Sequence, residues 1–188
     1  MNDIMLKCHS KLVGLLPMQR LVGERSELIL SGCRGLKYIG YYACSDMELD
    51  NLDLKDCVSL EHIGCNAFAR ALLLKLVLSH CVALKWVKPR VFLHSPLTEL
   101  KISGCVALEK IGEGAFKSAN LTTLDLSGCT ALGEVGEWAF CSSPLEKLNL
   151  QVKGRERPVR VGSTSFSLAK IEGFPHGAKL LNPIVYGH

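Results

Sequence analysis

Apolar residues return at a spacing of 24 along most of this chain. When each unit is numbered from 1 to 24, starting at Arg25, positions 4 and 6 are aliphatic in every copy between residues 25 and 144. They are Leu28, Leu52, Leu76, Leu100 and Leu124 at position 4, and Leu30, Leu54, Leu78, Ile102 and Leu126 at position 6. This alternation is the period of a strand that is buried on one side, so the pattern predicts a short strand in each unit.

A second apolar stretch follows in each unit, at positions 12, 15 and 20. Position 20 is Phe68, Phe92, Phe116 and Phe140, with Cys44 in the first full copy. One unit cannot enclose its own apolar face, whereas stacked copies bury it in a continuous core. We therefore expect a solenoid whose strands pair as a parallel sheet, at ~4.8 Å per coil.

The repeat divides the chain into four parts. Residues 1–24 are a degenerate N-terminal repeat or cap, in which Ile4, Leu6, Leu12 and Leu15 fall on positions 4, 6, 12 and 15. Residues 25–144 are five regular repeats, and 145–168 are a degenerate sixth whose Phe166 comes two residues late, so we expect an insertion within 153–160. Residues 169–188 are a C-terminal cap or tail.

The first half of each unit resembles the leucine-rich repeat pattern, and the second half, I-G-x-x-A-F as in Ile111–Phe116, resembles its BspA-like class. A cysteine at position 9 departs from that class. The resemblance implies an α/β-type solenoid: a leucine-rich repeat arc with a parallel β-sheet on the concave face and short helices or turns on the convex face. It also implies a non-enzymatic scaffold that binds another protein.

Position 9 is cysteine in every regular unit: Cys33, Cys57, Cys81, Cys105 and Cys129. We interpret these as small buried thiols with weak hydrogen bonds to the backbone, because stacking alone explains the period. Disulfides between coils are disfavoured, since identical positions point in parallel. No C-x-x-C pair supports a metal site, and we expect neither a metal nor a cofactor. Cys44 is expected in the core as a substitute for phenylalanine. Many unpaired cysteines favour a reducing compartment.

Composition narrows the classes of function. No apolar run approaches the ~20 residues that cross a membrane. The net charge of +4 is modest and its basic residues are scattered, which disfavours nucleic acid as a partner. The N-terminus lacks the order of a secretory signal, so we expect a cytoplasmic protein, or a surface or secreted one if the chain is a fragment. No nucleophile has a base and orienting group beside it, so no catalytic residue is expected.

Side chains that flank the inward leucines point out of the predicted sheet. The repeat does not dictate their identity, so they are free to encode a partner. The candidate partner-binding residues are Glu27, Ile29, Asn51, Asp53, Lys55, Lys75, Val77, Glu99, Lys101, Thr123, Asp125, Lys147 and Asn149.

Two other patches compete with this face. Residues 153–160 are basic and contain a proline, and they are interpreted as a solvated loop or a contact for an acidic partner. The aromatic residues of the outer half are expected mostly in structural packing, with partial exposure of Tyr42 and Trp138; the set is Tyr38, Tyr41, Tyr42, Trp86 and Trp138.

The leading hypothesis is thus a protein-binding scaffold that acts through the concave sheet, expected as a monomer. One alternative is a fragment of a BspA-like surface or secreted adhesin. Another is a structural solenoid that self-associates through its terminal coils.

Overall fold

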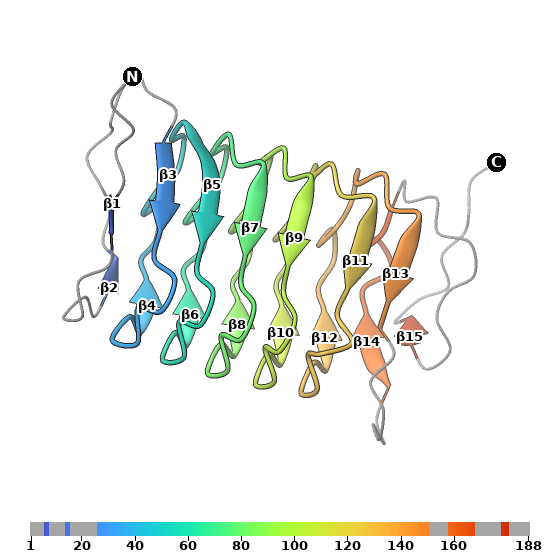
Figure 1. Cartoon of the computed structure of the whole chain (residues 1–188). Coiled ribbons are helices and arrows are strands. Elements are labelled where there is room, and N and C mark those ends of the chain that lie inside the picture. The colour runs from blue at the N-terminus through green and yellow to red at the C-terminus, as the bar shows by residue number, and fades with distance from the viewer. Residues whose placement is uncertain (1–5, 8–13, 16–25, 151–157, 168–177, 181–188) are drawn as a thin grey trace.

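The computed structural model describes residues 6–7, 14–15, 26–150, 158–167 and 178–180. In this part of the chain, 15 short strands and the turns between them form a row of stacked coils, and there is no helix (Figure 1). The predicted parallel-strand solenoid with a period of 24 is therefore confirmed. Of the two structures expected opposite the first sheet, helices or turns, the described residues adopt turns together with a second sheet.

The first wall of the solenoid is built from the predicted strands at positions 3 to 5. Five of them pair in one parallel sheet, and two more pair beside it: β1 (Leu6–Lys7), β3 (Ser26–Ile29), β5 (Leu49–Asp53), β7 (Lys75–Val77) and β9 (Glu99–Lys101), then β11 (Thr123–Asp125) and β13 (Lys147–Asn149). The register is one repeat per strand, since Leu52 pairs with Leu76 and Leu76 with Leu100. We call the outward side of β3 to β13 the first-sheet face.

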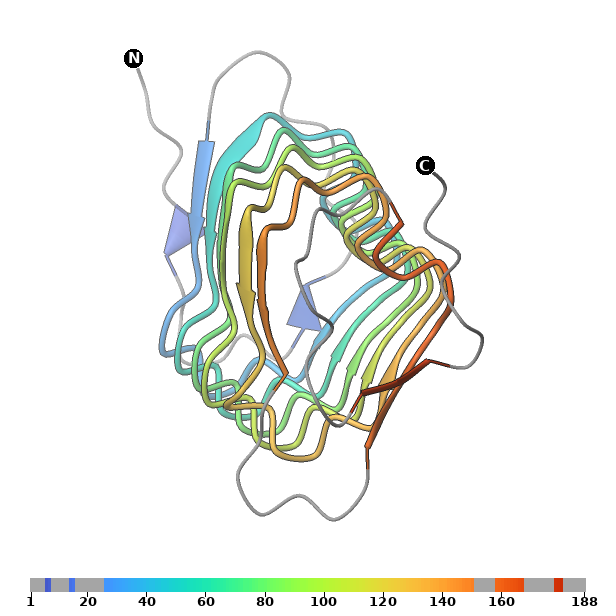
Figure 2. The ribbon, with the colours of Figure 1, turned by 90° about the vertical axis from the view of Figure 1, so that its right-hand side faces the viewer.

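The second wall is a parallel sheet that the sequence pattern did not predict. Its members in chain order are β2 (Gly14–Leu15), β4 (Tyr38–Ile39), β6 (His62–Ile63), β8 (Trp86–Val87), β10 (Lys110–Ile111), β12 (Glu134–Val135), β14 (Val159–Val161) and β15 (Ala178–Leu180). Position 15 of each unit points inward and position 14 points outward, as Ile63 and His62 do. Figure 2, a view along the stack, shows the two sheets as separate walls of one coil. We call the outward side of β4 to β14 the second-sheet face.

Turns replace helices at positions 17 to 23 because the backbone there hydrogen bonds between coils. The N–H of Phe92 donates to Ala115 O at 2.8 Å, and the N–H of Phe116 donates to Ala139 O at 2.8 Å. A helix would use these donors within its own segment. Each coil therefore turns through left-handed corners at positions 8, 18 and 22, where non-glycine residues such as Asp56, Trp138 and His94 have φ near 60°. Such values cost most side chains about 1 kcal/mol.

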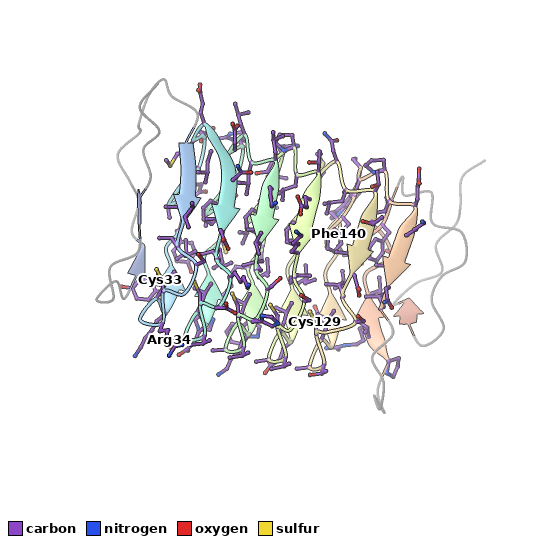
Figure 3. All side chains as sticks on the ribbon, in the orientation of Figure 1. Cys33, Arg34, Cys129 and Phe140 are labelled. Carbon is purple, nitrogen blue, oxygen red and sulfur yellow. The ribbon has the colours of Figure 1, made fainter. Side chains whose placement is uncertain are left out.

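The core runs the length of the stack between the two walls. The phenylalanines of position 20 form a continuous ladder with Phe166, and neighbouring ring centroids are 5.1 to 5.5 Å apart. Phe140 of this ladder is labelled in Figure 3. Cys44 is buried at the same position of the first coil, as expected.

The two ends of the stack depart from the 24-residue spacing in different ways. Val161 pairs with Val135, an offset of 26, so the extra two residues of the sixth unit lie before β14. Of the basic segment 153–160, residues 153–157 lie outside the described residues. Leu15 pairs with Ile39 as expected, but Leu6 pairs with Leu28, so it aligns with position 4 and the expected alignment with position 6 is wrong. Ile4 and Leu12 lie outside the described residues.

Candidate protein-binding surfaces

The structure brings the predicted partner-binding residues together on the first-sheet face. All of them lie on its strands except Lys55, which follows β5: Glu27 and Ile29 on β3, Asn51 and Asp53 on β5, Lys75 and Val77 on β7, Glu99 and Lys101 on β9, Thr123 and Asp125 on β11, and Lys147 and Asn149 on β13. From Lys101 onwards these side chains are exposed, and from Ile29 to Glu99 most are half-buried. The face is thus a mostly polar surface whose residues differ from coil to coil.

Glu99 organises the charges at the centre of this face. Its carboxylate lies 2.9 Å from the ammonium of Lys101 and 3.3 Å from that of Lys75 on the neighbouring strand. The hydrogen bond from Lys101, and then that from Lys75, lower the pKa of the Glu99 carboxyl below its ordinary value. Two lysines share one carboxylate, so this part of the face keeps a net positive charge.

Two of the predicted binding residues also have a structural role. The carboxylate of Asp53 accepts a hydrogen bond from the N–H of Lys55 at 2.8 Å, and that of Asp125 accepts one from the N–H of Ser127 at 2.9 Å. Both aspartates close the turn that follows their strand, as aspartate commonly does. Charge reversal at these positions would disturb the turn as well as the surface.

Two exposed aromatic residues, Tyr38 and Trp86, lie on the second-sheet face, and the other three lie in the turns that follow β4 and β12. The packing in the fold that was expected for most of the five is wrong. Tyr38, Tyr41 and Trp86 are exposed, Trp86 by 37% and Tyr41 by 63%, and so are Tyr42 and Trp138, whose exposure was expected. Tyr38, His62 and Trp86 occupy position 14 of successive coils, where the strands direct them outward. The sequence feature that points to this exposure is the alternation between position 14 and the apolar position 15. Strands of only two residues are too short for this alternation to be recognised.

The cysteines of position 9 serve the fold. The thiols of Cys57, Cys81 and Cys105 donate to main-chain oxygens of the preceding coil at 3.0 to 3.1 Å, and Cys129 does so at 3.5 Å. Burial raises the pKa of Cys57 to about 11. These buried thiols confirm the interpretation for four coils. It is wrong for Cys33, which is disulfide-bonded to a partner outside the described residues. Figure 3 labels Cys33 near β4, at one end of the row of coils, and Cys129 further along the row near β12.

Neither metal chemistry nor a membrane span is evident in the described part of the chain. No three His, Cys, Asp or Glu side chains there are grouped so that they could hold a metal ion. The same residues include no helix that is long and apolar enough to cross a membrane.

Stacked 24-residue coils with inward leucines at positions 4 and 6 define a leucine-rich repeat solenoid. The chain belongs to the family described as BspA type leucine-rich repeat region, whose model matches residues 37–170 in six copies. A comparison with curated proteins gave no match. Proteins of this solenoid class are generally non-enzymatic and generally bind other proteins.

Proposed function

We propose that this protein is a non-enzymatic scaffold that binds another protein through its first-sheet face. The observation that carries the proposal is the contrast between the two sides of the same strands. Leu52 and Leu76 point inward and hardly vary between coils. The outward residues differ from coil to coil and are charged, polar or aliphatic, apart from Asp53 and Asp125, which close their turns. Because stacking does not dictate the outward residues, a partner is the simplest source of their variety.

The charge pattern suggests what the partner presents. The carboxylate of Glu99 lies within ion-pair distance of both Lys75 and Lys101, so this row carries an excess of positive charge. Exposed ion pairs contribute little stability, so we assign these residues to recognition and not to stabilisation of the fold. The partner surface is therefore expected to be acidic opposite Lys101 and to make several moderate contacts, since this face contains no aromatic residue of the type that dominates tight interfaces.

The experiment is an affinity capture from reducing cell lysate with matched variants. The test variant is Lys101→Glu with Lys147→Glu on the first-sheet face, and the control is Arg34→Glu with Lys37→Glu, between β3 and β4. All four side chains are exposed and both variants change the net charge by the same amount. A protein captured by the wild type and the control but lost with the test variant supports the proposal. A protein lost only with the control contradicts it.

The same experiment separates the alternative functions. A partner found only on the outside of cells supports the adhesin interpretation, and capture of the chain itself supports the self-associating solenoid. We propose a reducing, cytoplasmic location, on the ground that seven of the described cysteines are free. The disulfide of Cys33 argues the other way. Fluorescence imaging of the tagged protein in its own cells, with the tag placed at either end, tests this location.

A further inference from the structure

The second-sheet face contains a hollow of about 320 Å³ between the coils of β8 and β10. This volume is at the lower end of the range for ligand sites, and it suits one or two side chains of a partner. The hollow is lined from two successive coils, by Trp86, Val87, Lys88 and Pro89 of one and by Lys110 and Gly112 of the next.

Lys88 breaks a rule that the other coils obey. Position 16 is otherwise glycine in Gly40, Gly64, Gly112 and Gly136, continued by Gly162. A Cβ atom at Gly64 or Gly112 would lie 2.8 or 2.6 Å from backbone atoms of the preceding coil. At Lys88 the coils are further apart: its N–H donates to Ile63 O at 3.4 Å, whereas the N–H of Gly112 donates to Val87 O at 2.8 Å. Stacking therefore favours glycine here, and the fold does not explain the lysine.

The ammonium of Lys88 lies over the ring of Trp86, with its Nζ 4.3 Å from the ring centroid. His62 stacks on this ring at 5.2 Å. No carboxylate in the described part of the chain pairs with Lys88. Glu113, which follows Gly112 of the hollow, pairs with Arg90 at 3.1 Å. Lys88 is thus held in place by the indole while its charge is available to an anion.

A second cation stands across the hollow. The Nζ of Lys110 is 2.6 Å from Glu134 Oε1, and the other oxygen of the same carboxylate is 3.1 Å from a guanidinium nitrogen of Arg160. One carboxylate shared between two cations leaves a net positive charge. The hollow thus combines a positive rim with an apolar wall made by Trp86 and Pro89.

We propose that this hollow binds an acidic side chain, together with a neighbouring apolar or aromatic one, from a peptide segment of a partner protein. The carboxylate takes a charge-assisted hydrogen bond from Lys88 and approaches Lys110. The apolar neighbour packs on Pro89 and on the part of Trp86 that His62 and Lys88 leave exposed. Trp is among the residues that most often anchor protein interfaces. The site is distinct from the first-sheet face, which lies on the other wall of the coil, and it does not depend on the function proposed for that face.

Two other classes of ligand fit less well. A sugar stacks on a free aromatic face, but His62 and Lys88 both lie against the Trp86 ring. A nucleic acid needs an extended positive surface, whereas Glu61 and Glu109 occupy position 13 on either side of Lys85. Binding of a sugar acid or of DNA in the hollow is one of the outcomes that the test below distinguishes.

The test measures the fluorescence anisotropy of a fluorescein-labelled, blocked peptide, Gly-Ser-Glu-Phe-Glu-Ser-Gly, titrated with the whole protein. The same peptide with glutamine in place of both glutamates is the ligand control. Lys88→Gly is the test variant, because it restores the glycine that the other coils carry and removes the ammonium. Lys117→Gln is the matched control, because Lys117 lies over Trp138 at 5.1 Å, away from the hollow.

We expect the acidic peptide to bind the wild type and Lys117→Gln equally, and Lys88→Gly at least about tenfold more weakly. The melting temperature of Lys88→Gly should equal or exceed that of the wild type, so that a loss of binding is not a loss of folding. The proposal is overturned if the glutamine peptide binds as well as the acidic one, or if Lys88→Gly binds as well as the wild type. Displacement of the peptide by equal concentrations of glucuronate, inorganic phosphate or a short DNA strand would also overturn it.

Discussion

Ser95 and Ser143 occupy position 23 of two units, and the structure predicts that their replacement by alanine has opposite effects. Both side chains are completely buried. The hydroxyl of Ser95 donates to Phe68 O at 2.9 Å, whereas the Oγ of Ser143 has no hydrogen-bond partner in the described structure. The same position is Ala71 and Ala119 in two other coils, so alanine fits this place in the stack.

The magnitudes follow from these contacts. Ser95→Ala removes one buried hydrogen bond, with a net value of about 1 kcal/mol. The substitution does not leave a buried acceptor unpaired, because Phe68 O still accepts a hydrogen bond from the N–H of Ala71 at 3.2 Å. No further loss of stability is therefore expected. Ser143→Ala removes a buried hydroxyl that gains nothing in return for its lost hydration, so it should increase the free energy of unfolding by about 1 kcal/mol. For a chain of this length, each change corresponds to about 2–4 °C in melting temperature.

Urea denaturation followed by circular dichroism measures both free energies of unfolding. The slopes against urea must agree among the wild type and the two variants, because a changed slope would show that the stack no longer unfolds as one unit. The double variant should be close to the wild type, since the two sites are two coils apart and their effects should add. A loss of stability of equal size in both single variants would show that the hydroxyl of Ser143 stabilises the fold as much as that of Ser95 does.

Three further predictions concern other features of the coil. His94 is exposed and has φ of 59°, so His94→Gly should raise the free energy of unfolding, measured in urea, by about 0.5–1 kcal/mol. The control is Glu109→Gly at an exposed position where φ is not positive, and it should lower the free energy of unfolding. Hydrogen bonds from Thr164 and Ser163 lower the pKa of the Glu137 carboxyl in the folded state. The stability that this carboxylate contributes is therefore present above its unfolded pKa and is lost as the pH falls through its folded pKa. Between pH 7 and pH 3 the free energy of unfolding should fall more for the wild type than for Glu137→Gln. Burial raises the pKa of Cys44 to about 12, so a thiol reagent at pH 8 should modify half-buried Cys65 first and Cys44 only on unfolding. Mass spectrometry of the modified peptides measures the order, and early modification of Cys44 would contradict its burial.

The first wall and the core could be predicted from the sequence because a 24-residue period repeats each inward residue many times. Leu52 and Leu76 are recognisable by their copies alone, and so is the phenylalanine ladder. The outward positions of the first-sheet face follow from the same alternation. The sequence could not show which of them are committed to the turns, as Asp53 and Asp125 are, because that depends on the direction of one carboxylate.

The second wall was missed for a different reason. Its strands are mostly two residues long, and two residues show no alternation. The choice between a helix and turns for the second half of each unit depends on whether its donors bond within the coil or between coils, as the N–H of Phe92 does. The sequence contains one indication of the hollow beside Trp86, because the unit of Lys88 is the one regular unit without glycine at position 16. Its depth and its second cation, Lys110, required the structure.

Titration calorimetry with the purified partner from the capture experiment measures how much the first-sheet face contributes to the affinity. The wild type, the Lys101→Glu and Lys147→Glu variant, and the Arg34→Glu and Lys37→Glu control are compared at one ionic strength. We expect the first-sheet variant to bind at least about tenfold more weakly than the wild type and the control variant to bind like the wild type. Equal affinity for the first-sheet variant and the wild type would contradict the claim that this protein recognises its partner through the first-sheet face.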